Sequence, residues 1–220
     1  MIIGVIGFIG SGKGTAADVL VEKHGFVKLS FADAVKDATA AIFGWQRSLL
    51  EGDTLESREF RETNDEWWAN RVGFEHFSPR LALQLMGTEA GRDVFHKDVW
   101  VYALERKMEM YQNVVIADVR FPNEIEWMRS KGGFAVRVVR GMEPAWVDTA
   151  KIANNINAAK HAEAREQMIE SRVHYSEWAW VGQIMDYQLD NDGSISMLEA
   201  DIGHMLKVFT GPQKSAILAA

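Results

Sequence analysis

The sequence predicts an α/β protein with three layers, in which helices cover both faces of a central parallel sheet and two mostly helical segments are inserted. The first observation behind this prediction is that short apolar runs alternate with helical patterns along the chain, as in parallel sheets. The second is a glycine-rich loop between the first apolar run and the first helical pattern. The third is size, because 220 residues that are 47% hydrophobic can bury a sizeable core.

The chain begins with two strand–helix pairs. Residues 1–6 are continuously apolar and predict a strand that is buried on both faces. Residues 15–23 carry apolar side chains at helical spacing, and Gly25 is expected to end this helix. Residues 26–29 predict a second strand and residues 32–43 a second helix with one apolar face. This alternation predicts that the two strands are parallel.

A polar segment, residues 44–77, interrupts the alternation. It is charged, contains scattered aromatic residues and has poor periodicity, so we expect an inserted, partly helical flap. Ser78 and Pro79 then supply a capping hydroxyl and a proline at the first helical position. They predict a helix through about Gly91, and a further helix follows at residues 97–111.

The second half of the chain returns to strands and helices. The expected elements are a strand at 114–117, a helix at 124–131, a strand at 134–139, a second polar insert at 141–176 that is helical around 158–171, a strand at 187–189, a turn at 191–193, and a helix with Leu198, Ile202, Met205, Leu206 and Phe209 on one face. We expect residues 1–220 to form one domain with the two inserts, and the tail after Gly211 to be frayed.

Composition excludes several classes of function. The 24 basic and 31 acidic residues give a net charge of −7, which is the wrong sign for binding a nucleic-acid polymer. The chain has no cysteine, so thiolate catalysis, zinc–thiolate sites and iron–sulfur clusters are excluded. The apolar start lacks the basic region of a signal peptide, and no run approaches the roughly 18 apolar residues that a membrane span needs. We therefore expect a soluble, cytoplasmic protein without membrane or polymeric nucleic-acid partners.

The strongest motif is the loop at residues 7–15, GFIGSGKGT, between a predicted strand and a predicted helix. Its glycines let backbone N–H groups converge on phosphate oxygens, and its lysine reaches the β- and γ-phosphates of a nucleotide. The alternative is a glycine turn that only packs helix against strand. The GKGT sequence resembles the corresponding motif of nucleoside monophosphate kinases of the adenylate kinase kind. In those enzymes water replaces the usual hydroxyl ligand of magnesium. The residues expected to hold ATP phosphates are Gly10, Ser11, Gly12, Lys13, Gly14 and Thr15.

An acid and an arginine follow the buried strand at 114–117. Asp118 is placed as an acid that organises magnesium, directly or through water, and Arg120 is placed to bind phosphate. The alternative is a structural Asp–Arg pair that caps the next helix. Glu124 is a weaker candidate, because an acid in a first helical turn also complements the helix dipole.

Five segments carry a family resemblance. They are SFADAVK at 30–36, RLALQLMGTEAGRDVFHKDVW at 80–100, DVRFPNE at 118–124, HYSE at 174–177 and DNDG at 190–193. Over nearly the whole chain the sequence resembles the deoxynucleoside monophosphate kinases of tailed bacteriophages. The resemblance implies a P-loop kinase in which the inserts are acceptor-binding and lid-like. It also implies that the protein uses Mg²⁺ and transfers the γ-phosphoryl group of ATP to a deoxynucleoside monophosphate (dNMP). The product would serve phage DNA synthesis, in the host cytoplasm if the chain is phage-encoded.

The resemblance also implies roles for single residues. Asn191 and Gly193 are implied to lie near the adenine of ATP. Arginine grips phosphate bidentately, glutamine can read a base edge, and tryptophan can stack on a base, although each residue alone equally fits a surface or core position. The residues implied to contact the acceptor nucleotide are Phe31, Ala32, Asp33, Lys36, Arg80, Gln84, Gly87, Thr88, Arg92 and Trp100, with Asp118, Arg120 and Glu124.

The remaining candidates concern the lid and a calcium loop. Arg140 follows a predicted strand and is the best-placed arginine to cover the transferring phosphoryl group as a catalytic residue; Arg165 and Arg172 are the alternatives. Residues 188–199 approach the spacing of an EF-hand, but the first ligand position is Gln188 and a strand precedes it.

Two alternative functions stay open. One is a small-metabolite kinase of the dephospho-coenzyme A kinase type, and the other is a non-catalytic module that binds a nucleotide or calcium. The sequence also leaves open which bases are accepted and whether the chain forms a homodimer.

Overall fold

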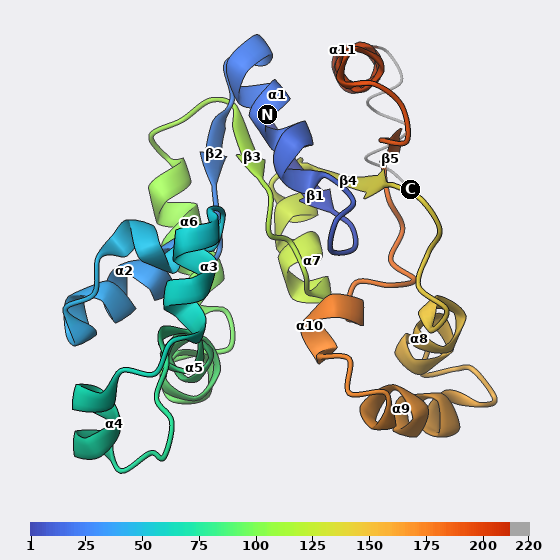
Figure 1. Cartoon of the computed structure of the whole chain (residues 1–220). Helices are drawn as coiled ribbons and strands as arrows, with labels where there is room; N and C mark the ends of the chain where they lie inside the picture. The colour runs from blue at the N-terminus through green and yellow to red at the C-terminus, as the bar shows by residue number, and fades with distance from the viewer. Residues whose placement is uncertain (212–220) are drawn as a thin grey trace. The chain divides into compact units, whose positions relative to one another are not determined.

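The computed structural model describes residues 1–211 and contains one sheet of five parallel strands in the order β2-β3-β1-β4-β5 (Figure 1). The central strand β1 pairs with β3 on one side and β4 on the other, so that Gly4 lies opposite both Ile116 and Ala135. The strands are β1 (Ile2–Ile6), β2 (Val27–Leu29), β3 (Val114–Ile116), β4 (Phe134–Val139) and β5 (Tyr187–Asp190). The expected parallel sheet is confirmed.

The chain divides into two compact units, which are described separately. Unit 1 consists of Met1–Leu29 and the chain from Tyr111 onward, and it contains the whole sheet. Unit 2 is Ser30–Met110. The helices of unit 1 are α1 (Lys13–His24), α7 (Pro122–Ser130), α8 (Val147–Asn154), α9 (His161–Glu170), α10 (Tyr175–Trp178) and α11 (Ile195–Thr210).

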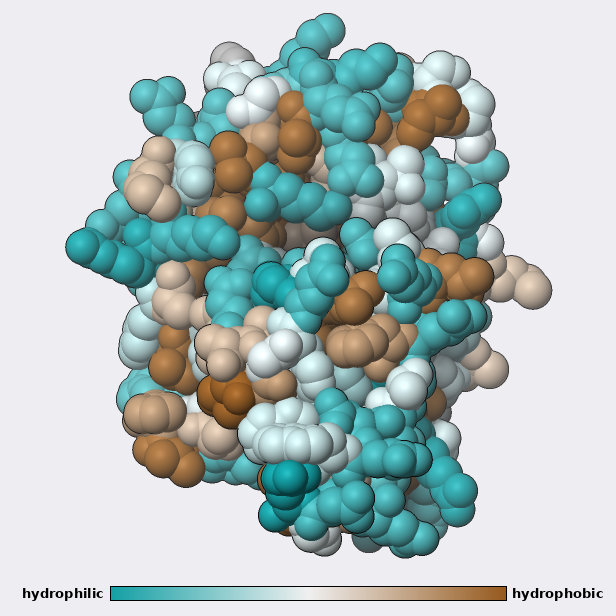
Figure 2. Space-filling model, turned by 60° about the vertical axis from the view of Figure 1, so that its left-hand side comes forward, coloured by the Kyte–Doolittle hydropathy of each residue, from teal (hydrophilic) through white to brown (hydrophobic). Residues whose placement is uncertain are grey.

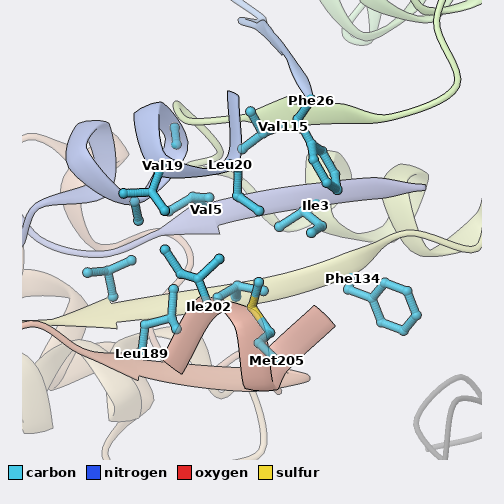
Figure 3. Close-up of a cluster of buried hydrophobic side chains, with 14 of the residues drawn as sticks. Ile3, Val5, Val19, Leu20, Phe26, Val115, Phe134, Leu189, Ile202 and Met205 are labelled. Atoms are coloured by element: carbon cyan, nitrogen blue, oxygen red, sulfur yellow. The ribbon is translucent and has the colours of Figure 1, made fainter. Parts of the chain in front are cut away.

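Unit 1 has three layers because alternate residues of β1 face opposite sides. Ile3 and Val5 pack into a core with α1 and α11 (Figure 3). On the other face a β-carbon at Gly4 would overlap Met128 of α7, so this glycine lets the helix approach the strand closely. Phe209 of α11 closes the first core and stacks on Phe134 at 3.9 Å between ring centroids. The predicted α/β/α arrangement is confirmed.

Unit 2 consists of helices joined by loops, and residues 30–110 contain no strand. Its elements are α2 (Asp33–Phe43), the 3₁₀ helix η1 (Arg47–Leu50), α3 (Leu55–Glu62), α4 (Glu66–Val72), α5 (Pro79–Leu85), the π-helix η2 (Met86–Asp93) and α6 (Val99–Met108). Ser78 caps α5 as predicted, by accepting a hydrogen bond from the Leu81 N–H at 3.3 Å. The helix expected through Gly91 instead changes from α to π geometry at Met86.

Both inserts contain the expected helices, with two additions. Residues 44–77 hold η1, α3 and α4. In the second insert, α9 matches the helix expected around 158–171, but α8 and α10, which begins at Tyr175, were not predicted. The prediction of a frayed tail concerns residues after Gly211, which lie outside the described part of the chain.

Charged and polar side chains cover most of the face shown in Figure 2, where the hydrophobic side chains form separate patches. Within residues 1–211, no helix combines the length and the apolar character that crossing a membrane requires.

Candidate active site

The glycine-rich loop connects β1 to α1 at the carboxyl edge of the sheet. Gly10 and Gly12 have φ angles of 82° and 94°, in the region that side chains disfavour. A β-carbon on Gly12 would also overlap the amide of Asn191, which donates a hydrogen bond to the Ser11 carbonyl at 2.9 Å. Ser11 is 5% exposed, and its Oγ has no hydrogen-bond partner among residues 1–211. Such an orphaned hydroxyl beside a helix start fits a loop that binds an external polar ligand.

Lys13 is the first residue of α1 and folds over this loop. Its Nζ donates to the carbonyl oxygens of Gly7 at 2.7 Å and Phe8 at 2.8 Å. Burial, and next the positive charge of Arg120, lower the pKa of Lys13 from 10.5 to about 8, while the Glu177 carboxylate opposes both effects. Two cations that destabilise each other in a half-buried site favour the binding of an anion between them.

Asp118 and Arg120 follow β3 at the same edge of the sheet. The backbone N–H of Arg120 donates to Glu124 Oε2 at 2.8 Å, and the N–H of Phe121 donates to the same oxygen at 3.0 Å. Glu124 is 2% exposed, so this carboxylate holds the loop that carries Arg120. The Arg120 side chain forms an ion pair with Glu177, which ends the HYSE segment but was not predicted as a site residue.

Arg140 comes directly after β4 and is exposed. It lines a hollow of about 80 Å³ together with Ser11 and Phe8 of the glycine-rich loop. The Phe8 ring packs against Trp146 and Trp180, with ring centroids 5.3 Å and 4.8 Å apart. These contacts fix one side of the loop to the second insert and to the segment that follows it.

The alternative lid arginines, Arg165 and Arg172, both lie in the second insert. The guanidinium of Arg165, on α9, lies 6.0 Å from the centre of the Trp178 ring. Arg172 follows α9 and has a φ of 56°, which is rare for a residue with a side chain.

The turn after β5 lies against the glycine-rich loop. Asn191 holds the turn in place, because its side-chain amide donates to the Ser11 carbonyl and its backbone N–H donates to the Val139 carbonyl at 2.9 Å. Asp192 accepts a hydrogen bond from the N–H of Gly141 at 2.6 Å. Glu199, the last position of the EF-hand pattern, pairs with Lys23 at 3.1 Å.

The EF-hand interpretation of this segment is therefore wrong. A strand precedes the turn where an EF-hand has a helix. Across residues 1–211, no group of three or more histidine or acidic side chains is arranged to hold a metal ion. Gly193 lies in the same turn, between Asp192 and the Ser194 cap of α11.

The predicted acceptor residues other than Asp118, Arg120 and Glu124 lie in unit 2, where α2 carries Asp33 and Lys36. Lys36 Nζ binds Glu51 Oε2 at 2.5 Å. Arg47 also pairs with Glu51, and it reaches Asp33 at 3.5 Å. Lys107 of α6 binds the other oxygen of Asp33 at 3.1 Å. These contacts form a network of alternating charges around the first turn of α2.

Arg47, Glu51 and Lys107 were not predicted as site residues. Burial raises the pKa of Glu51, but the hydrogen bonds and charges of Lys36 and Arg47 outweigh this effect and lower it below its usual value. Glu51 is therefore held as a carboxylate that orients Lys36. Its only sequence signal is the i,i+4 spacing from Arg47.

The remaining acceptor residues lie on or near α5, η2 and α6. Arg80 and Gln84 are exposed on α5, and Arg80 pairs with Glu62 at 2.8 Å. The Trp100 indole N–H donates to the Gly87 carbonyl at 2.8 Å, and a β-carbon at Gly91 would overlap its ring. The indole therefore packs on η2. Of the others, Thr88 is exposed, Arg92 is half-buried, Phe31 is buried, and Ala32 directly precedes α2.

Comparison with known proteins decides the family. A protein of Acanthamoeba polyphaga mimivirus, named as a deoxynucleotide monophosphate kinase, is 33% identical over 153 residues, which cover 64% of this chain and 74% of that protein. The chain belongs to the deoxynucleotide monophosphate kinase family. The deoxynucleoside-5′-monophosphate kinase of Escherichia phage T5 is 26% identical over 179 residues, covering 59% of this kinase and 72% of the phage protein. The resemblance found in the sequence is confirmed.

Solved structures of other proteins align with this chain over almost its whole length. TT1252 from Thermus thermophilus aligns over 96% of this chain and 98% of its own, with 19% identity and a TM-score of 0.47. Shikimate kinase from Aquifex aeolicus aligns over 96% and 100%, with 15% identity and a TM-score of 0.45. These scores carry no information about the substrate. No protein-family model matches the chain.

Proposed function

We propose that this kinase transfers the γ-phosphoryl group of ATP to a deoxynucleoside monophosphate and releases ADP and a deoxynucleoside diphosphate. The observation that carries the proposal is the pair of cations Lys13 and Arg120 at a glycine-rich loop, at the carboxyl edge of a parallel sheet. Nucleotides bind at this edge in α/β proteins, and phosphoryl transfer requires mainly positioning and charge stabilisation.

The donor ATP would bind in unit 1. Backbone N–H groups of residues 10–15 and the start of α1 would hold its phosphates, and Ser11 Oγ would gain a partner that the described part of the chain does not supply. Asn191 and Gly193, in the turn held against this loop, would border the adenine.

The donor set at Asp118 fits magnesium. Mg²⁺ usually binds through one or two carboxylates together with substrate phosphates and water, and Asp118 follows β3 as a half-buried carboxylate on the same sheet edge as the loop. Asp118 would hold the ion directly or through water. When bound with ATP, the ion would neutralise charge on the β- and γ-phosphates.

The acceptor would bind through unit 2. Lys36 and Arg80 would bind its phosphate, and Gln84 and Thr88, both exposed, would face its base or sugar. The network of Asp33, Arg47 and Glu51 would keep Lys36 in position. We propose that both units act as one kinase domain, with the insert at 44–77 serving the acceptor and the insert at 141–176 acting as a lid.

The transfer step needs charge stabilisation rather than a general base. The acceptor phosphate is already an anion, so its oxygen can attack the γ-phosphorus while the bond to the β-phosphate oxygen breaks. Lys13, Arg120 and Arg140 would stabilise the negative charge on the transferred group and on the leaving ADP. Exclusion of water by the inserts would limit hydrolysis of ATP.

The test is a coupled assay of ADP formation with ATP, Mg²⁺ and each deoxynucleoside monophosphate in turn. At least one acceptor should stimulate turnover, and Lys13→Met should lower the rate by about 10²-fold or more. Lys23→Met is the matched control, because this lysine of the same helix pairs with Glu199 instead of the loop. Turnover with dephospho-coenzyme A alone would favour the small-metabolite alternative, and no acceptor-dependent turnover would refute the proposal.

A further inference from the structure

We propose that Glu177 is a positioning residue for phosphoryl transfer, which holds the Arg120 guanidinium beside the glycine-rich loop through their ion pair. The inference rests on the proposed function and assigns a role to the contact between α10 and the loop after β3. Glu177 and Arg120 are 57 positions apart in the chain and meet in unit 1.

The geometry directs one end of Arg120 toward α10. Its Nη1 donates to Glu177 Oε1, and the same nitrogen lies 3.4 Å from Ser176 Oγ. An arginine has five N–H donors. The contacts at Nη1 therefore leave other N–H groups of the guanidinium to bind a phosphate while Glu177 restrains its orientation.

Both partners are carried by fixed backbone. Trp178, next to Glu177, is 3% exposed, and its indole N–H donates to the Val173 carbonyl at 3.2 Å. The Asn154 side chain of α8 donates to the Trp178 carbonyl at 2.7 Å. On the other side, Glu124 holds the backbone N–H of Arg120. The ion pair thus joins two restrained segments, so it can set the direction of a long side chain.

The charge of Glu177 also acts on Lys13. Burial and the charge of Arg120 both lower the pKa of Lys13, and Glu177 is the negative group that opposes them. A carboxylate near two cations lowers their mutual repulsion before the nucleotide arrives. Glu177 therefore favours the charged form of Lys13 and pairs with Arg120 in the free protein.

This role predicts a specific pattern of kinetic effects. Without the carboxylate, the Arg120 guanidinium samples other orientations. It then stabilises less well the negative charge that develops on the phosphoryl group during transfer. We expect Glu177→Gln to lower kcat by about 10- to 100-fold, as is typical of residues that orient a functional group. The affinity for ATP, measured by calorimetry without acceptor, should change less than about threefold, because the loop and Lys13 remain. Glu177→Asp should recover part of kcat, because it keeps the charge.

The deciding experiment is a double-mutant cycle with Arg120→Ala, Glu177→Gln and the double variant, in the kinase assay with ATP, Mg²⁺ and the best deoxynucleoside monophosphate. If Glu177 acts through Arg120, the double variant should be about as slow as Arg120→Ala alone. Glu22→Gln, which changes an exposed carboxylate near the end of α1, is the matched control and should keep the wild-type rate.

Contradictory outcomes separate this inference from the proposed function. If Glu177→Gln slows the Arg120→Ala variant by the same factor as it slows the wild type, Glu177 does not act through Arg120. A loss of ATP affinity of tenfold or more in Glu177→Gln would also overturn the role, because it would indicate a general defect of the nucleotide site. If the wild-type protein phosphorylates no deoxynucleoside monophosphate, the proposed function itself fails.

Discussion

The position of Lys13 predicts that ATP binding takes up a proton in alkaline solution. Burial, followed by the charge of Arg120, sets the pKa of Lys13 at about 8 in the free protein. Bound phosphates stabilise the ammonium form, so binding raises this pKa. By the ordinary titration relation, roughly half of the free protein lacks the proton at pH 8 and about nine-tenths lacks it at pH 9. Each ATP bound should therefore take up about 0.5 proton at pH 8 and about 0.9 proton at pH 9.

Calorimetry in pairs of buffers with different ionisation enthalpies measures this proton uptake directly. The triphosphate is fully ionised in this range, so uptake reports on the protein. Lys13→Arg is the control, because an arginine stays charged at pH 9. ATP binding to this variant should therefore be accompanied by no proton uptake. Uptake below about 0.2 proton at pH 9 in the wild type, or equal uptake in the arginine variant, would refute the assigned role of Lys13.

Three further substitutions test other parts of the account. Gly12→Ala introduces a β-carbon at a φ of 94° against Asn191, so it should cost about 1–3 kcal/mol and weaken ATP binding; an unchanged dissociation constant would contradict the loop geometry. Phe209→Ala removes a ring stacked on Phe134 at 3.9 Å and should lower the free energy of unfolding in urea by about 3–5 kcal/mol, whereas a loss below about 1 kcal/mol would contradict the core assignment. Lys36→Met should raise the KM of the deoxynucleoside monophosphate about tenfold and leave the KM of ATP unchanged; the reverse pattern would place Lys36 at the donor.

Most of the sheet could be predicted because its strands are short and continuously apolar. Residues 134–139 were predicted as a strand with the same limits that β4 has. Helix α8 was missed because its buried face consists of Val147, Ala150 and Ala153, and two alanines give little hydrophobic contrast in a polar segment. The change to π geometry at Met86 has no sequence signal of its own.

The candidate site could be predicted only where its residues form a motif of neighbouring positions in the sequence. The glycine-rich loop and Asp118 with Arg120 could be found because the residues are close in the chain and adjoin a predicted strand. Glu177 could not be paired with Arg120, because the contact joins distant segments and depends on where α10 is held. Lys107 and Asp33 are likewise 74 positions apart, and both look like ordinary surface charges in the sequence.

Transfer of label from [γ-³²P]ATP is the most direct test of the central claim. The protein is incubated with labelled ATP, Mg²⁺ and the four standard deoxynucleoside monophosphates separately, and the products are resolved by chromatography. We expect a labelled deoxynucleoside diphosphate for at least one acceptor, and the loss of this product in Lys13→Met. Label that appears only as inorganic phosphate, or in none of the diphosphates, would contradict the claim that this chain is a kinase of deoxynucleoside monophosphates.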